Sequence, residues 1–331
     1  MAARKLINEK MDHEVITTDQ LTQSGQLKHL LHLKGLDRTL IVAILDRAQN
    51  YVRPTGAVPA RDDCLAGRTV ANLFFEASTR TRASFELAAK RMSADVLNLD
   101  VNMSSRKKGE SILDTIYTLQ AMGVGIFVVR DASAGIPALI ANKVEQHINI
   151  LNAGESDISH PTQGLLDMLT IRQHKGRLDD LTITIIGDIA HSRVARSLTE
   201  GLAIVGNNAI RLVAPPGLAP DPANYPGMEL TEDIDGAIEG TDAVVTLRIQ
   251  KERIKEKSGL MTSHEYFEAY GLTEKRLKLA KPDAIVMHPG PMNRDVEIEG
   301  SVADGPQSAI TQQVTNGLAV RMAILATITR T

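Results

Sequence analysis

The chain has 331 residues, of which 43% are hydrophobic and 23% charged, and this length and composition predict two globular domains. Lys and Arg total 37 against 40 Asp and Glu, so the net charge of -3 offers no basic field for nucleic acid or an anionic membrane. The single cysteine, Cys64, excludes an internal disulfide framework and a zinc site built from several cysteines. The sequence has no apolar run long enough to span a bilayer, and its charged start does not resemble an export signal. We therefore expect a cytoplasmic protein that binds small molecules.

The first half of the chain alternates between helical and extended patterns. Residues 1 to about 27 are mostly polar and predict an arm that is flexible or ordered only against a partner. A helix capped by Asp37 follows and stops at the Arg-Pro-Thr-Gly segment of 53–56. Strands are then predicted at 69–75, 96–100, 124–129 and 148–152, with helices at 81–92, 110–122 and 136–145. Strands that alternate with helices indicate a parallel sheet.

The second half repeats this pattern after a long helix that begins at Pro161 and joins the two sheets. Strands are predicted at 181–188, 209–214, 242–249 and 284–289, and helices at 193–205 and 232–239. A last helix, roughly 308–328, is expected to pack on a core through Val314, Leu318, Val320, Ile324 and Leu325. The predicted fold is therefore α/β, with two domains that each contain a parallel sheet flanked by helices.

Polar residues follow the first strand, where a helix begins. Ligands of open α/β sheets bind beyond the carboxyl ends of the strands, so the EASTRTR segment at 76–82 is a candidate site. The free N–H groups of a helix start, the hydroxyls and the Arg80 guanidinium together suit a phosphate. A Ser or Thr cap beside solvated arginines is the simpler alternative.

Two further candidates lie in the first half. The loop at 102–109 carries three adjacent cations before Gly109, and Lys108 could close over a bound dianion, although such a loop alone is usually solvated. Arg130 ends the third strand, and the topology brings it near the HPTQ segment of 160–163. A single histidine is more often structural than catalytic. A guanidinium, an imidazole and an amide together can nevertheless polarise a carbonyl group and stabilise its oxyanion.

A fourth candidate lies in the second half. Arg193 follows the strand that ends in Gly187-Asp188, and Arg248 ends another strand, so each could bind a carboxylate in a fork, with surface salt bridges as the alternative. The sequence contains no phosphate-binding G-x-x-x-x-G-K-[ST] loop, no G-x-G-x-x-G turn after its strands, no H-E-x-x-H and no Cys-x-x-Cys. These absences argue against an ATPase, a standard NAD enzyme and a zinc hydrolase.

Several segments together carry a resemblance to a known family. They are FFEASTRTR at 74–82, SSRKKGE at 104–110, HPTQGLLDMLTI at 160–171, GDIAHSRVARS at 187–197, LRIQKER at 247–253 and HPGPMNR at 288–294. In this order they resemble the catalytic chains of the aspartate carbamoyltransferases, from about Lys28 to the C-terminus. The resemblance implies transfer of a carbamoyl group from carbamoyl phosphate to L-aspartate, an early step of pyrimidine synthesis, without metal or organic cofactor.

The resemblance also implies an organisation. Residues 28–160, completed by the helix at 308–331, would bind carbamoyl phosphate, and residues 161–307 would bind aspartate. The active site would lie in the cleft between the domains and at the subunit interface of a homotrimer. Ser104 and Lys108 would reach into the neighbouring subunit's site.

Roles for individual residues follow from the same resemblance. The phosphate would be held by Ser78, Thr79, Arg80 and Thr81. The carbonyl oxygen would contact Arg130, His160 and Thr81, and the carbamoyl amide Gln163. Aspartate would contact Arg193, Arg248 and Gln250, next to the turn at Gly290 and Pro291. We expect His160 to act as a hydrogen-bonding group rather than as an obligatory base.

Alternatives remain for the activity and the assembly. Ornithine carbamoyltransferases share the phosphate half, but their Ser-Met-Gly and His-Cys-Leu-Pro segments are absent here, where His288-Pro-Gly-Pro stands instead. A non-catalytic scaffold of the same fold is the second alternative. The long arm, and the likeness of HPGPMNRDVEIEG to relatives that assemble with dihydroorotase or a dihydroorotase-like subunit, predict a possible partner of that kind. The sequence neither implies nor excludes a regulatory chain.

Overall fold

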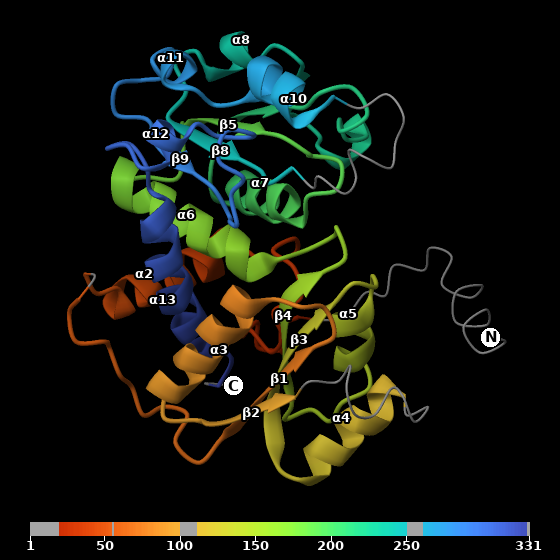
Figure 1. Ribbon diagram of the computed structural model, residues 1–331. Helices are drawn as coiled ribbons and strands as arrows, with labels where there is room; N and C mark the ends of the chain where they lie inside the picture. Colours follow the sequence, from red (N-terminus) through yellow and green to blue (C-terminus); the bar gives the residue numbers. More distant parts are fainter. Residues whose placement is uncertain (1–19, 55, 100–110, 250–260, 330–331) are drawn as a thin grey trace, which may run out of the picture.

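The computed structural model describes residues 20–54, 56–99, 111–249 and 261–329, and these form two α/β units (Figure 1). The first unit contains a four-stranded parallel sheet with strand order β2-β1-β3-β4, and the second a five-stranded parallel sheet with order β7-β6-β5-β8-β9. The predicted fold class is confirmed.

The first unit follows the predicted order of elements. Its strands are β1 (Thr69–Phe74), β2 (Asp95–Leu99), β3 (Val124–Asp131) and β4 (Asn149–Glu155). Its helices are α2 (Arg38–Tyr51), α3 (Thr79–Arg91), α4 (Ile112–Ala121) and α5 (Ile136–Ala141). Asp37 caps α2 as predicted, because its carboxylate accepts a hydrogen bond of 2.7 Å from the backbone N–H of Leu40.

The second unit contains the predicted elements and several short ones that the sequence did not predict. Its strands are β5 (Thr182–Ile186), β6 (Ala209–Val213), β7 (Glu229–Thr231), β8 (Ala243–Thr246) and β9 (Ile285–Met287). Its helices are α7 (Arg193–Val205), α8 (Ile234–Ile238), α10 (Ser263–Tyr270), α11 (Glu274–Leu277) and α12 (Gly300–Ala303), with a 3-10 turn, η2 (Pro222–Asn224). Strand β7 and helices α10, α11 and α12 are additions to the prediction.

Two long helices lie between the units and join them (Figure 1). Helix α6 (Pro161–Lys175) is buried on all sides from Pro161 to Ile171, and α13 (Ile310–Ile328) packs against α2, α3 and α6. One apolar core runs through both units and includes Leu165 of α6 and Val320 of α13. The prediction that Val314 packs on a core is wrong, because its side chain is 65% exposed.

The described part of the amino-terminal arm packs on its own chain. Gln20 is buried, and its Oε1 accepts hydrogen bonds of 2.7 and 3.0 Å from the backbone N–H groups of Leu31 and His32. Leu27 is also buried in the core. For residues 20–27, the expectation of an arm that is flexible or ordered only against a partner is therefore wrong. Residues 1–19 lie outside the described part.

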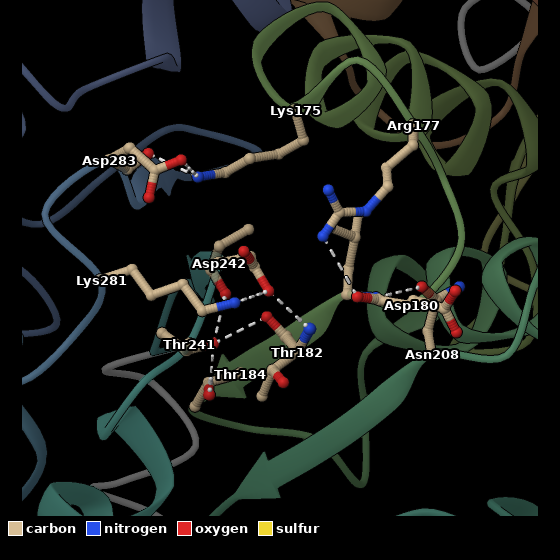
Figure 2. A network of polar contacts seen from close by, with 12 residues as sticks. Lys175, Arg177, Asp180, Thr182, Thr184, Asn208, Thr241, Asp242, Lys281 and Asp283 are labelled. Carbon is tan, nitrogen blue, oxygen red and sulfur yellow. Dashed lines mark hydrogen bonds and ion pairs between the residues drawn. The ribbon is translucent and has the colours of Figure 1, made fainter.

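A network of polar contacts lies at the amino ends of the strands of the second sheet (Figure 2). Asp242 accepts hydrogen bonds from Lys281 Nζ at 2.8 Å and from the backbone N–H of Thr182 at 2.9 Å. Lys175, the last residue of α6, forms an ion pair of 2.8 Å with Asp283 just before β9. The Asp242 contacts therefore join the amino ends of β5 and β8 to the segment before β9, and the Lys175 ion pair attaches the end of α6 to that segment.

Candidate active site

A cavity of about 870 Å³ lies where the carboxyl ends of both sheets meet the start of α6 and one side of α13. Residues of both units line it, and it is large enough for two small substrates. The cavity lies beyond the carboxyl ends of the strands, where ligands of open α/β sheets bind. Among the described residues, no group of three or more His, Cys, Asp or Glu is placed to hold a metal ion.

One end of the cavity is formed by the start of α3. Helix α3 begins at Thr79, two residues earlier than predicted, so the N–H groups of residues 79–81 lie in its first turn. Ser78 occupies the capping position, but its hydroxyl makes no capping hydrogen bond, and it lines the cavity instead. This arrangement disfavours the simple alternative of a capping serine. The helix start therefore has the free N–H groups and the dipole end that suit an anion.

Arg80 adds a cation to this end of the cavity. Burial, followed by the nearby charge of Arg248, lowers the pKa of Arg80. Its guanidinium packs against Gly290, where a Cβ atom would lie 3.2 Å from Arg80 Cζ and the backbone φ is 64°. Glycine at position 290 therefore lets the turn of the second unit approach Arg80 at this end of the cavity.

The middle of the cavity brings together the residues that were predicted to polarise a carbonyl group. Arg130 is the second-last residue of β3, and His160 and Gln163 lie at the start of α6; all three are buried and line the cavity. Burial, followed by the charges of Arg130, Arg193 and Arg321, holds the pKa of His160 well below its ordinary value. The imidazole is therefore neutral near pH 7 and can exchange hydrogen bonds without carrying charge.

Glu76 links the two units across the cavity, a role that the sequence analysis did not assign. Its carboxylate accepts a hydrogen bond of 2.7 Å from Arg130 Nη2. It also accepts a fork of two bonds from Arg193, of 2.9 Å from Nη1 and 2.8 Å from Nη2. Burial opposes ionisation of Glu76, but these bonds and charges outweigh it and lower the pKa of the carboxyl group. Arg193 thus forms the predicted two-bond contact with a carboxylate, and this carboxylate is that of Glu76 in the same chain rather than that of a ligand.

The second unit supplies the other end of the cavity. Arg193 at the start of α7 and Arg248 after β8 both line it, together with the turn at His288-Pro289-Gly290-Pro291. His191 also lines this end, with its Nδ1 2.8 Å from Asp188 Oδ1. The cations of this end suit a ligand that carries carboxylates.

Three of the predicted site residues, Ser104, Lys108 and Gln250, lie outside the described residues. The structure brings the others together around the cavity: Ser78, Thr79, Arg80, Thr81, Arg130, His160, Gln163, Arg193, Arg248, Gly290 and Pro291. It adds Gln313 and Arg321 of α13, which the sequence pattern suggested only as part of a packing helix. Arg321 is the single charged residue of α13, and this is the signal that would have found it, whereas Gln313 stands among other polar residues.

Comparison with known proteins identifies the class of protein that this fold and cavity define. The family model of the aspartate/ornithine carbamoyltransferase carbamoyl-P binding domain matches residues 28–173, and that of the Asp/Orn binding domain matches residues 179–328. The chain therefore belongs to the aspartate/ornithine carbamoyltransferase family. It binds carbamoyl phosphate and transfers its carbamoyl group to aspartate or ornithine.

Solved structures of this family resemble the chain over most of its length. Aspartate transcarbamoylase from Trypanosoma cruzi in complex with N-(phosphonacetyl)-L-aspartic acid is 33% identical, with a TM-score of 0.82 over 93% of this chain and 98% of that one. The same enzyme in complex with carbamoyl phosphate is 33% identical, with a TM-score of 0.82 over 91% and 95%. Ornithine carbamoyltransferase from Thermus thermophilus is 26% identical, with a TM-score of 0.79 over 91% and 98%.

The family models divide the chain between residues 173 and 179, at the end of α6, and the second model includes α13. Our predicted division, at residue 160 with the last helix assigned to the first domain, remains a prediction. Because α6 and α13 pack on each other and lie between the sheets, they belong structurally to the junction (Figure 1). Within the described part of the chain, no helix is long and apolar enough to cross a membrane.

Proposed function

We propose that the acceptor is L-aspartate and that the product is N-carbamoyl-L-aspartate, as in pyrimidine synthesis. The observation that carries this proposal is the pair of arginines, Arg193 and Arg248, at the second end of the cavity. Aspartate brings two carboxylates and suits this end, whereas the side-chain ammonium of ornithine would meet like charge. The higher identity to the aspartate enzymes, 33% against 26%, also supports aspartate.

The proposed roles follow the two ends of the cavity. Ser78, Thr79, Arg80 and Thr81 bind the phosphate at the start of α3, together with Ser104 and Lys108 of a neighbouring subunit. Arg130, His160 and Thr81 contact the carbonyl oxygen, and Gln163 contacts the carbamoyl amide. Arg193, Arg248 and Gln250 bind aspartate beside Gly290 and Pro291.

The proposed reaction needs no side-chain nucleophile. The uncharged α-amine of aspartate attacks the carbamoyl carbon and forms the new C–N bond, and the C–O bond to phosphate then breaks. The oxyanion of the intermediate lies near Arg130 and neutral His160, and the leaving phosphate accepts the amine proton. The low pKa of His160 supports a hydrogen-bonding role, because a protonated imidazole would need a much lower pH.

The activity is tested by supplying the purified chain with carbamoyl phosphate and either aspartate or ornithine. Colorimetric detection of carbamoyl aspartate with aspartate alone is the expected result. Citrulline from ornithine would overturn the assignment of Arg193 and Arg248. Activity with neither amine would direct the test to a missing partner subunit.

We further propose a homotrimer in which each site is completed by the neighbouring loop at 102–109. Mixing two inactive variants, Lys108→Ala and Arg130→Ala, tests this proposal. Mixed trimers would recover activity at interfaces that carry neither change. No recovery from refolded mixtures would show that each chain completes its own site.

The arm suggests a partner of the dihydroorotase kind. Because residues 20–27 pack on the chain itself, a truncation that removes only residues 1–19 leaves those contacts in place. The size of a co-expressed pair, measured with and without these residues, tests the proposal. No difference between the two forms would remove the arm from the interface.

A further inference from the structure

A chain of buried polar contacts lies behind the wall of the cavity. Asp167 lies one helical turn after Gln163 on α6 and is fully buried. Its Oδ1 accepts a hydrogen bond of 3.0 Å from Gln163 Nε2 and one of 2.7 Å from Gln313 Nε2 on α13. Both glutamines line the cavity, whereas Asp167 lies behind them.

The backbone fixes the direction of this chain. The Oε1 atom of Gln313 accepts a hydrogen bond of 2.9 Å from the backbone N–H of His288, a group that can only donate. The amide of Gln313 must therefore direct its Nε2 to Asp167. When the carboxyl group is ionised, or carries its proton on Oδ2, the Oδ1 atom of Asp167 is an acceptor for both amides.

The orientation of Gln163 follows from this fixed acceptor. One N–H of its Nε2 is engaged with Asp167 Oδ1, so Oε1 is the side-chain acceptor left for a ligand in the cavity. An amide that could turn freely would offer either a donor or an acceptor. An amide held in one orientation keeps Oε1 in a fixed place as its acceptor, besides the second N–H of Nε2, and this acceptor favours a ligand that has a donor there.

We propose that Asp167 is a positioning residue that holds the amide oxygen of Gln163 toward the carbamoyl NH₂ group and so selects carbamoyl phosphate over acyl phosphates without an N–H donor. The proposal rests on the contact between Gln163 and the carbamoyl group. It does not depend on which amine is the acceptor. Acetyl phosphate is the matched probe, because a methyl group replaces the NH₂ group and the phosphate is unchanged.

The alternative is that the chain of contacts only holds α6 against α13. In that case, loss of Asp167 would weaken all ligands of the cavity together, inorganic phosphate included. A positioning role predicts a different pattern, in which only the ligand with an N–H donor loses affinity. The comparison of three ligands in one assay therefore separates the two cases.

The experiment measures the KM for carbamoyl phosphate and the inhibition constants of acetyl phosphate and inorganic phosphate, with whichever amine the wild-type chain uses. A chain active only with ornithine would refute the proposed acceptor and leave this test intact. For Asp167→Leu, which removes the acceptor, we expect the preference for carbamoyl phosphate over acetyl phosphate to fall about tenfold, the value of one hydrogen bond. The inhibition constant of inorganic phosphate should change less than about twofold.

Two further variants keep the test decisive if Asp167→Leu does not fold. Asp167→Asn retains an acceptor oxygen and should retain the preference. Gln313→Met removes the other amide on the same oxygen and leaves Gln163 with its acceptor, so it should retain the preference as well. Loss of the preference in either variant, or its survival in a folded Asp167→Leu protein, would overturn the proposal.

Discussion

Glu76 and Asp167 are carboxyl groups beside the same cavity with opposite surroundings. Glu76 receives its hydrogen bonds from the guanidiniums of Arg130 and Arg193, which hold its pKa below the ordinary value despite burial. Asp167 receives its bonds from the amides of two glutamines, and burial raises its pKa to about 7 although these bonds and Arg321 oppose the shift.

The difference shows how one chemical group can serve two purposes. Glu76 stays charged throughout the neutral range and holds two cations across the junction of the units, so it contributes electrostatics. Asp167 has a raised pKa and is held by amides rather than by cations, and its contribution is the position of its oxygen atom. Substitutions of Glu76 or its arginines should therefore affect mainly the kinetics, whereas substitution of Asp167 should affect mainly the pH dependence of stability.

The largest effect is expected when a cation held by Glu76 is removed. Arg130→Met takes away a preorganised donor at the centre of the cavity, and loss of such a donor lowers kcat by about 10²- to 10³-fold. Steady-state kinetics with carbamoyl phosphate check this value. Arg294→Met, which removes an exposed arginine paired with Asp304, is the matched control. A loss below about fivefold would show that Arg130 contributes little beyond its contact with Glu76.

Replacing the charge of Glu76 should have a smaller effect. Glu76→Gln keeps the shape but cannot balance two guanidiniums, so Arg130 and Arg193 would repel each other and lose their fixed positions. We expect kcat/KM to fall about 30-fold. This value is at the low end of the losses seen when one partner of a buried charge pair is removed, because the Glu76 side chain is 31% exposed. Unchanged kinetics in 0.1 M salt would contradict a role for its charge.

Asp167→Asn should change the pH dependence of the free energy of unfolding more than it changes the activity. Its pKa in the folded chain, about 7, exceeds that of an unfolded aspartate, so the group favours folding below about pH 4 and loses this contribution as the pH rises through 7. The free energy of unfolding of the wild type, relative to Asp167→Asn, should therefore decrease from pH 4 to 7 and then level off. Urea titrations of both proteins at several pH values measure this difference. A difference that stays flat or increases would contradict the raised pKa.

Much of this architecture could be predicted from patterns along the chain. The helix predicted at 193–205 has both of its ends at the expected residues in α7. Polar residues predicted at the carboxyl ends of strands, such as Arg130 and Arg248, do line the cavity, because parallel strands direct these ends to one side of the sheet. The short elements β7, α11 and α12 span only three or four residues, too few for periodicity to reveal.

Contacts between distant segments could not be predicted in the same way. Glu76 lies 117 residues before Arg193, and nothing local indicates that they pair. Asp167 lies in a helix buried on all sides, so no polar face distinguishes it. Val314 has the spacing of a core residue and is exposed, because that side of α13 borders the cavity. Whether a side chain at the junction is buried depends on both units, so the residue pattern of one segment does not predict it.

The smallest effect on activity and stability is expected for substitution of a third carboxylate, that of Asp304. Its contact with an arginine resembles that of Glu76 in geometry and differs from it in solvent exposure. Asp304 accepts a fork from Arg294, with bonds of 2.7 and 2.8 Å, much as Glu76 does from Arg193. The two side chains are 68% and 47% exposed, so water screens the pair and hydrates either partner when the other is removed. Asp304→Asn should therefore leave both kcat/KM and the urea midpoint unchanged within error. If it matched Glu76→Gln in effect, geometry rather than burial would determine the value of the fork, and the contrast between the cavity carboxylates would need another cause.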